Sequence, residues 1–303
     1  MSEQRSRPGP IGFRVSATSS AGLDWLMLDA MWARAGEFEV FDAGWMSDHL
    51  SDASRERGGV AFEPFTTLAA LAHRVPGRWL GVAVASATFR HPALVAKAAT
   101  VLDNVTGGRF VLGLGAGWHQ GEHDAFGIPL PAMRERFDRL EAGLRTITAL
   151  FGPDAAPGRG VTLGDSMYPL RDATNEPQPM CPGGPAIWLG GQRPRGIGLA
   201  VRYAEGWPMP GNRPGDVGYF AEKRDEIRRA LDDAGRSADD FTFAAQLDCG
   251  TSTETRRAAL EVARRFVAAG ANHVILGVPA VAGPDGIGAM AREVAEPLQD
   301  VVA

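Results

Sequence analysis

The sequence has few cysteines and no long hydrophobic run. Its 303 residues include only Cys181 and Cys249, which lie far apart and form neither a CxxC pair nor a zinc spacing. This excludes a disulfide framework and favours two reduced thiols. No apolar run is long enough to span a membrane, and the first ten residues lack the apolar core of a signal peptide. We therefore expect a soluble, cytoplasmic protein that does not enter a membrane.

The sequence also lacks any concentration of positive charge. The net charge is −5 at pH 7, and no basic stripe stands out, so a nucleic-acid partner is not expected. Apolar residues make up 45% and charged residues 22%, as in ordinary globular proteins. We expect residues 1–303 to form a single domain, with residues 1–10 as a flexible N-terminal segment.

Short apolar runs alternate with helical patterns along the chain. The run 80–85 is almost wholly apolar, as expected for a strand buried on both faces. The predicted strands are 12–17, 43–47, 80–85, 110–114, 186–189, 206–209, 241–247 and 273–277. The predicted helices are 23–38, 92–105, 131–151, 193–204, 214–234, 253–269 and 284–296.

This alternation predicts an α/β fold with a parallel sheet, and the length suits a (β/α)8 TIM barrel. A doubly wound sheet is the rival fold, which we rank lower because no GxGxxG turn follows the first strand. Two stretches, 48–62 and 152–185, are too long for ordinary connections, and we expect them to be functional or mobile insertions after strand 2 and before strand 5. The active site of such a barrel lies at the carboxyl ends of its strands.

Ser47, Asp48 and His49 directly follow the second predicted strand. Polar residues there lie at the mouth of a barrel, which favours a catalytic role over the alternatives of a cap or a surface loop. Arg90 and His91 follow the third strand, where they either reach a ligand or solvate a turn. For His91 the two interpretations are balanced.

Two glycine-rich segments follow strands four and five. The first, GLGAGWH at 113–119, removes side chains where a flat ligand or another backbone comes close, although a tight barrel corner also uses glycine. The nearby His119, Glu122 and His123 have a spacing that could suggest a metal, but they sit on a glycine-rich loop without a partner cluster, so no metal site is expected. The second segment, GGQRPRG at 190–196, predicts an anion site at a helix start, with charge added by Arg193 and Arg195.

Several common catalytic motifs are absent. The sequence contains no GxSxG, no HExxH and no Walker loop, so hydrolase chemistry has no visible apparatus. Glycine-lined strand ends and a phosphate site without a nucleophile indicate that a cofactor carries the chemistry. His273 opens the last strand, which places it at the bottom of the barrel, where residues usually serve stability.

These motifs together resemble the luciferase-like oxidoreductase family over roughly residues 12–278. The resemblance rests on an ordered set: SDH at 47–49, TFRHPALVAKAATVLDNVTGGRFVLGLGAGW at 88–118, GIPLPAMRERFDRLEAGL at 127–144, IWLGGQ at 187–192 and AVRYAEGW at 200–207. Members are (β/α)8 barrels, usually homodimers, that bind FMN or the deazaflavin coenzyme F420. The sequence is most similar to the branch that is assigned F420.

The resemblance implies roles for individual residues. Asp48 and His49 would lie beside the deazaflavin, with His49 in proton transfer and Asp48 orienting it or bonding the ring. A bulge with a cis peptide between Ala83 and Val84 would press the backbone against one face of the ring. The expected cofactor-binding residues are Ala83, Val84, Ser86, Gly115, Ala116, Gly117, Gly190, Gly191, Gln192 and Arg193. The expected substrate-pocket residues are Arg90, Trp118 and His119.

The sequence departs from the glucose-6-phosphate dehydrogenases of this family. Where they carry acidic residues, this chain has Trp118 and, approximately, Thr18, so sugar-phosphate oxidation of that style is not expected. We therefore predict hydride transfer between F420 and a small organic substrate. One alternative is an FMN-dependent monooxygenase that works with a separate flavin reductase, and another is a non-catalytic member that only binds the cofactor.

Overall fold

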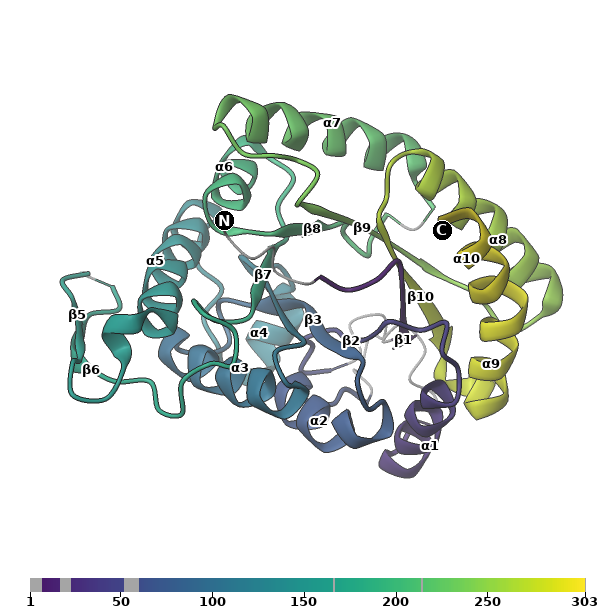
Figure 1. The fold of residues 1–303 in the computed structure, drawn as a ribbon, viewed down its shortest axis with the longest axis horizontal. Helices are drawn as coiled ribbons and strands as arrows, with labels where there is room; N and C mark the ends of the chain where they lie inside the picture. The colour runs from purple at the N-terminus through teal and green to yellow at the C-terminus, as the bar shows by residue number, and fades with distance from the viewer. Residues whose placement is uncertain (1–6, 17–22, 52–59, 166, 214, 303) are drawn as a thin grey trace.

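Eight parallel strands close into a barrel in the computed structural model, which describes residues 7–16, 23–51, 60–165, 167–213 and 215–302 (Figure 1). Around the barrel the order is β1-β10-β9-β8-β7-β4-β3-β2. The strands are β1 (Ile11–Ser16), β2 (Ala43–Met46), β3 (Trp79–Ser86), β4 (Phe110–Gly115), β7 (Ala186–Leu189), β8 (Gly206–Pro208), β9 (Thr242–Asp248) and β10 (His273–Pro279). The predicted (β/α)8 fold is confirmed, and each predicted strand is found within about two residues of its expected bounds.

Helices surround the barrel, and α4 lies within their ring, at the mouth (Figure 1). They are α1 (Trp25–Gly36), α2 (Pro64–Leu71), α3 (Pro92–Thr106), α4 (Gln120–Phe126), α5 (Met133–Phe151), α6 (Pro194–Tyr203), α7 (Val217–Asp233), α8 (Thr253–Ala268), α9 (Gly283–Met290) and α10 (Glu296–Val302). Short 3-10 turns lie at Ala72–Arg74, Pro153–Ala155 and Ala280–Ala282, and a π-helical turn, Ala291–Ala295, joins α9 to α10. No described helix is both long enough and apolar enough to cross a membrane.

Two tryptophans fill the centre of the barrel. The indoles of Trp45 and Trp188 stack with their centroids 4.6 Å apart, and both are about 1% exposed. The strands beside them supply Gly12, Gly81 and Gly206, and a Cβ on any of these would collide with an indole ring. The inner face of the strands therefore alternates bulky aromatics with glycine, which closes the barrel as a packed core and not as a pore.

The bottom of the barrel is closed by His273 and by residues 7–10. The Nδ1 of His273 lies 2.6 Å from the Gly9 carbonyl oxygen, and its Nε2 accepts a hydrogen bond of 3.0 Å from the Trp45 indole N–H. The Val274 N–H donates to the Pro10 carbonyl. Gly9 and Pro10, which we expected to belong to a flexible segment, are thus hydrogen-bonded to the last strand. Residues 1–6 lie outside the described residues.

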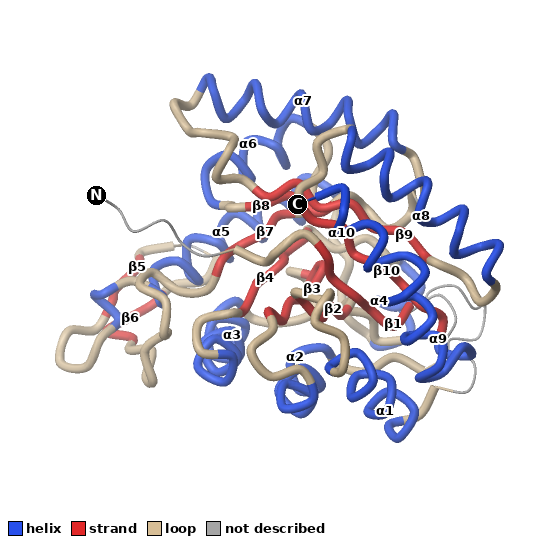
Figure 2. The backbone as a smooth tube through the Cα atoms, turned by 45° about the vertical axis from the view of Figure 1, so that its right-hand side comes forward, coloured by secondary structure: helices blue, strands red, loops and turns tan. Residues whose placement is uncertain are grey.

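The two insertions differ from a plain loop. In the first insertion, residues 52–59 lie outside the described part of the chain. The helix α2, which was not predicted, begins directly after this insertion. The second contains an antiparallel hairpin of β5 (Val161–Leu163) and β6 (Leu170–Ala173), which stands outside the ring of helices beside α5 (Figures 1 and 2). Further along this insertion, the buried Asn175 donates to Thr100 of α3 at 2.9 Å. The insertion is thereby fastened to the outer side of the barrel.

The protonation of His273 predicts a loss of stability in acid. Burial lowers its pKa to about 4, so the folded protein holds it neutral while the unfolded chain takes up a proton near its ordinary pKa of about 6.5. The stability from this residue is present above that ordinary pKa and is lost as the pH falls towards the folded value. We expect a cost of about 2 kcal/mol in the free energy of unfolding between pH 8 and pH 5.

Urea unfolding at both pH values should show that His273→Gln removes this part of the pH dependence. The control is His73→Gln, which replaces an exposed histidine and should leave the pH dependence as in the parent protein. An equal loss of stability in acid for His273→Gln and the parent would contradict the assignment.

Candidate active site

The mouth of the barrel is poor in side chains where β3, β4 and β7 end. The Ala83–Val84 peptide is cis, as the resemblance implied, and the pairing of β3 with β4 shifts register between Val82 and Ala85. The Val84 side chain leans over the neighbouring strands: a Cβ on Gly115 would lie 2.9 Å from Val84 Cγ2, and one on Gly190 would lie 3.4 Å from it. These glycines leave a backbone-lined surface beside a half-buried Val84.

Asp48 is buried and ties the end of β2 to the end of β3. Its side chain is fully buried, and the Arg90 guanidinium donates to both carboxylate oxygens, at 2.7 and 2.9 Å. The Ser86 backbone N–H donates to Asp48 at 2.9 Å. Arg90 also pairs with Glu63 at 2.8 Å. Although burial opposes it, the bonds to Asp48 and Glu63 raise the pKa of Arg90, which stays a cation.

The partner of His49 is Glu122 and not Asp48. The His49 Nδ1 lies 3.0 Å from Glu122 Oε2, and the Glu122 side chain is 1% exposed. Its other oxygen accepts the backbone N–H groups of Leu50 and Ser51 at 2.7 and 3.1 Å. Burial alone would raise the pKa of Glu122, but the bonds from His49 and from the two N–H groups outweigh it and lower that pKa. Glu122 therefore acts as an anion that anchors His49.

The segment after β4 contributes a hydrogen-bonded cluster and one exposed aromatic. His119 caps α4 by accepting the Glu122 N–H at 3.0 Å, and Trp118, 64% exposed, stands edge-on to His49 with centroids 6.2 Å apart. The buried His123 bonds to Thr88, which bonds to Ser86. Among the described residues no three histidine, cysteine, aspartate or glutamate side chains are placed to hold a metal ion.

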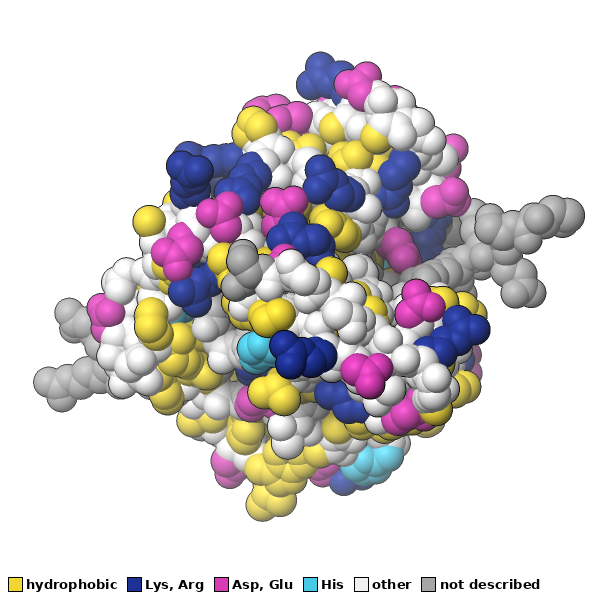
Figure 3. Space-filling model, turned by 90° about the vertical axis from the view of Figure 1, so that its left-hand side faces the viewer, with side chains coloured by type: hydrophobic (Ala, Val, Ile, Leu, Met, Phe, Trp, Pro, Cys, Tyr) yellow, Lys and Arg dark blue, Asp and Glu magenta, His cyan; other side chains and the backbone are white. Residues whose placement is uncertain are grey.

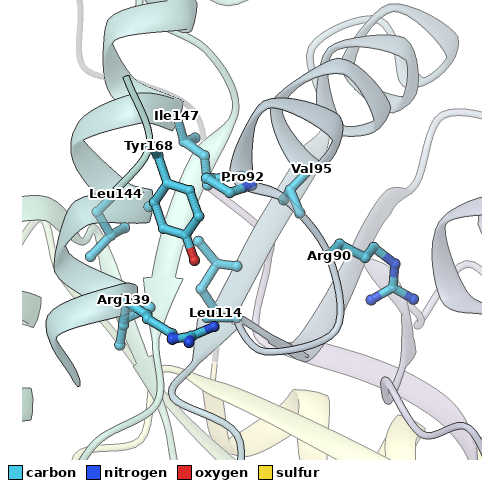
Figure 4. A pocket seen from close by; sticks show the side chains of 11 residues that line it. Arg90, Pro92, Val95, Leu114, Arg139, Leu144, Ile147 and Tyr168 are labelled. Carbon is cyan, nitrogen blue, oxygen red and sulfur yellow. The ribbon is translucent and has the colours of Figure 1, made fainter. Parts of the chain in front are cut away.

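Two further predicted residues have local roles. His91 caps α3 through a hydrogen bond of 3.2 Å from the Ala93 N–H, which agrees with the turn interpretation. Arg90 lines, with its carbon chain, a hollow of about 270 Å³ between α3 and α5. Figure 4 shows Tyr168 of the insertion pointing into this hollow, whereas the guanidinium of Arg90 points away from it. The Arg90 guanidinium is bound instead by the carboxylates of Asp48 and Glu63.

The turn between β7 and α6 has the form of an anion site. The N-cap residue of α6, Arg193, is exposed, and its side chain makes no capping hydrogen bond. Gly191 packs against Gly196, since a Cβ on either would lie 3.0 Å from the other's Cα. Arg195, which we expected to add charge here, instead pairs with Asp138 of α5 at 2.5 Å. The positive charge at this turn therefore comes from Arg193 and the helix start.

A polar wall faces the glycine-lined side of the mouth, and its residues are not among the predicted site residues. Arg14 of β1 donates to Gln246 at 2.7 Å and to Asp248 at 3.2 Å, and Ser16 donates to the same Asp248 oxygen. A Cβ on Gly277 of β10 would collide with this cluster. The signal was present as two pairs of polar residues at alternate positions in otherwise apolar strands, which places them on the inner face.

A hollow of about 460 Å³ connects this wall with the predicted catalytic loop, since Ser16, Ser47, His49 and Phe62 all line it. Thr18, the approximate position of one departure from the sugar-phosphate enzymes, lies outside the described residues.

On the outer surface, Figure 3 looks from the side of the β5–β6 hairpin and shows Lys and Arg interspersed with Asp and Glu. The structure thus brings His49 together with Glu122 and Trp118, and places Arg14 and Asp248 on the wall of β1 and β9.

Comparison with known proteins assigns the family. A model of the luciferase-like monooxygenase family matches residues 29–298, so the chain belongs to this family and the resemblance is confirmed. The phthiodiolone/phenolphthiodiolone dimycocerosates ketoreductase of Mycobacterium bovis (strain BCG / Pasteur 1173P2) is 33% identical over 222 residues, 67% of this chain and 56% of that protein. The F420-dependent glucose-6-phosphate dehydrogenase of Beutenbergia cavernae is 32% identical over 198 residues, 65% of this chain and 55% of that protein. The matches span little more than half the length of these curated relatives.

Solved structures share the fold. An F420-dependent secondary alcohol dehydrogenase in complex with an F420-acetone adduct superposes with a TM-score of 0.73 at 18% identity, over 98% of this chain and 99% of that chain. A long-chain alkane monooxygenase superposes with a TM-score of 0.75 at 16% identity, over 97% of this chain and 92% of that chain. At these identities the superpositions establish the barrel fold and do not establish the reaction.

The three bonds to Glu122 predict a stability effect that depends on which atoms are removed. Glu122→Ala leaves the part-buried N–H groups of Leu50 and Ser51 without their acceptor and should cost about 1–3 kcal/mol in the free energy of unfolding. Glu122→Gln keeps an acceptor oxygen and should cost less. Urea unfolding at neutral pH measures both, with Asp124→Ala, an exposed change on α4, as the control. If Glu122→Ala proved as stable as the control, the anchoring role would be wrong.

Proposed function

We propose that this protein is an F420-dependent oxidoreductase that transfers a hydride between the deazaflavin and a small organic substrate. The observation that carries the proposal is His49, held at the barrel mouth by a buried Glu122, beside a surface lined by the cis peptide and glycines. The named functions of two matched proteins, a ketoreductase and an F420-dependent dehydrogenase, support the same reaction class.

The residues present fit a flat, phosphate-bearing cofactor. The Ala83–Val84 backbone and Gly115 would cradle one face of the ring. Gly115 has no side chain to fill this space, and a Cβ there would collide with Val84. Ser86, Ala116 and Gly117, at the ends of β3 and β4, would border the ring. Gly190, Gly191, Gln192 and Arg193 would hold the phosphate at the start of α6, where backbone N–H groups and the helix dipole favour an anion. When bound, the ring would accept or donate the hydride.

His49 would hold the proton that accompanies the hydride. Its Nδ1 faces Glu122, so its Nε2 is the nitrogen available to the substrate. A carboxylate at Nδ1 fixes the ring orientation and stabilises the protonated ring when the proton is taken up. Asp48 would act indirectly, because its oxygens are engaged by Arg90 and the Ser86 N–H. It positions the β3 backbone against the ring.

The polar wall and the hollow beside it would receive the substrate. The Arg14 side chain is partly exposed, and Asp248 is exposed at the strand end. These groups would bond to polar atoms of the substrate at a distance from the reacting carbon. Trp118 and His119 would border the substrate from the β4 side. A partly polar substrate with a reacting carbonyl or alcohol suits this arrangement.

Titration of the apo-protein with each cofactor tests the proposal. We expect saturable binding of F420, followed by its fluorescence, and a Kd about tenfold higher for Arg193→Ala, since the lost bond to the phosphate is charge-assisted. The matched control is Arg202→Ala, at the opposite end of the same helix, which should bind as the parent does. Tight FMN binding without F420 binding would overturn the choice of cofactor in favour of the FMN-dependent monooxygenase.

The role of His49 is tested separately from binding. His49→Ala should keep its Kd for F420 and reduce the hydride-transfer rate by about a hundredfold or more, as loss of a general acid–base group does. The rate is measured by the change in F420 fluorescence with a panel of secondary alcohols and, in the reverse direction, ketones. Unchanged turnover in His49→Ala would contradict the assigned role.

We also propose that the protein is a homodimer that buries the outer face of α3. Leu94, Val101 and Val105 recur at helical spacing along this face and are 65%, 45% and 51% exposed. An apolar stripe of this kind is uncommon on a free surface, and a two-fold axis through it would bury the stripe against its own copy.

The double variant Leu94→Glu/Val101→Glu should change the molar mass in light scattering from that of a dimer to that of a monomer. Two charges placed in an apolar interface lose their hydration without gaining a partner. Leu26→Glu, which charges the exposed Leu26 of α1, is the control and should leave the dimer intact. A monomeric parent protein at micromolar concentration would refute the proposal.

A further inference from the structure

A chain of short hydrogen bonds leads from the mouth of the barrel to α4. Ser86 Oγ lies 2.7 Å from Thr88 Oγ1, which lies 2.7 Å from His123 Nε2. The other ring nitrogen of His123, Nδ1, lies 2.7 Å from the His119 carbonyl oxygen. His123 is 1% exposed, whereas Ser86 is only half-buried. The chain therefore has one buried end and one end at the mouth.

The buried end sets the direction of every hydrogen bond in the chain. A carbonyl oxygen only accepts, so the hydrogen of a neutral His123 ring is on Nδ1 and its Nε2 is a bare acceptor. Thr88 then donates its single hydrogen to Nε2, and Ser86 donates its single hydrogen to Thr88. The Ser86 oxygen is left with lone pairs only. Turning the ring over would break both histidine bonds, so the geometry selects this orientation.

Gly117 packs directly against the two hydroxyls. A Cβ on Gly117 would lie 2.5 Å from Thr88 Oγ1 and 2.8 Å from Ser86 Oγ, and the residue has a φ of 80°. Only glycine lets the chain pass so close in this conformation. The Ser86 N–H is in turn bonded to Asp48, so both the backbone and the hydroxyl of Ser86 are fixed.

We propose that His123 and Thr88 are positioning residues that hold the Ser86 hydroxyl as an obligate hydrogen-bond acceptor, and that it accepts from a ring N–H of the bound cofactor. The second half rests on the proposed function. Ser86 lies two residues beyond the cis peptide that would cradle the ring. Both deazaflavin and flavin rings carry an imide N–H, and a serine without a hydrogen to donate pairs with that group and not with the carbonyls beside it.

Histidine side-chain NMR tests the direction of the chain without any ligand. The protein has six histidines, so a long-range proton–nitrogen spectrum of nitrogen-labelled apo-protein is resolvable, and the His123 signals are those that His123→Phe removes. We expect the hydrogen of the His123 ring on Nδ1. His273 serves as the internal reference, because its bonds to the Gly9 carbonyl and from the Trp45 indole require the same tautomer.

A hydrogen on His123 Nε2 would overturn the proposal, because the two hydroxyls would then point the other way. A ring in the Nδ1–H form supports it.

Binding of F420 to two matched variants tests the ligand half. Thr88→Val keeps the shape of the side chain but frees the Ser86 hydrogen, and it should raise the Kd for F420 about fivefold, as expected when one hydrogen bond is lost. Thr88→Ser keeps the hydroxyl and should bind F420 as the parent does. Circular dichroism confirms that both variants are folded.

Equal Kd values for the two variants would refute the ligand half. If the parent protein bound neither F420 nor FMN, the proposed function and the ligand half would fail together. The histidine spectrum would still decide whether Ser86 is an acceptor, so the two failures are distinguishable.

Discussion

The stack of Trp45 on Trp188 is the constraint on which the rest of the structure depends. The two indoles fill the space that the eight strands enclose. Gly12, Gly81 and Gly206 lie where any side chain would collide with an indole ring. The stack separates a closed bottom, sealed by His273, from an open mouth. Because the lower barrel is full, a ligand can enter only above the indoles, where the inner faces change from aromatic to glycine and polar residues.

Above this floor, two buried carboxylates hold the loop after β2 in place. Asp48 connects it to β3 through Arg90 and the Ser86 N–H, and Glu122 connects it to α4 through His49 and two backbone N–H groups. Each carboxylate accepts three hydrogen bonds, which offset the cost of burying its charge. The loop that carries His49 is therefore fixed from both sides, so its imidazole is presented at a defined place in the mouth.

Much of the architecture could be predicted because it is local. Strands buried on both faces are apolar runs, and the polar or glycine-rich segments that end them are visible without a structure. The helix α2, which directly follows the first insertion, and the β5–β6 hairpin within the second were missed because their patterns are short and their packing depends on α3 and α5. Glu122 was visible only as a metal candidate, since nothing in its spacing shows that it reaches His49 across 73 positions. Arg14 and Asp248 are 234 residues apart and meet only because β1, β10 and β9 are neighbours in the closed barrel.

The sequence by itself determined the family, the barrel, the segments at the mouth and the place of the cis peptide, because these follow from ordered motifs and from the alternation of strand and helix. Only the tertiary structure decided which side chains meet. It placed Glu122 and not Asp48 beside His49, and it paired Arg195 with Asp138 of α5. It also formed the hydrogen-bond chain that makes the Ser86 hydroxyl an acceptor. Hydrogen bonds and ion pairs depend on distances of a few ångströms between segments far apart in the chain, and closure of the barrel sets those distances.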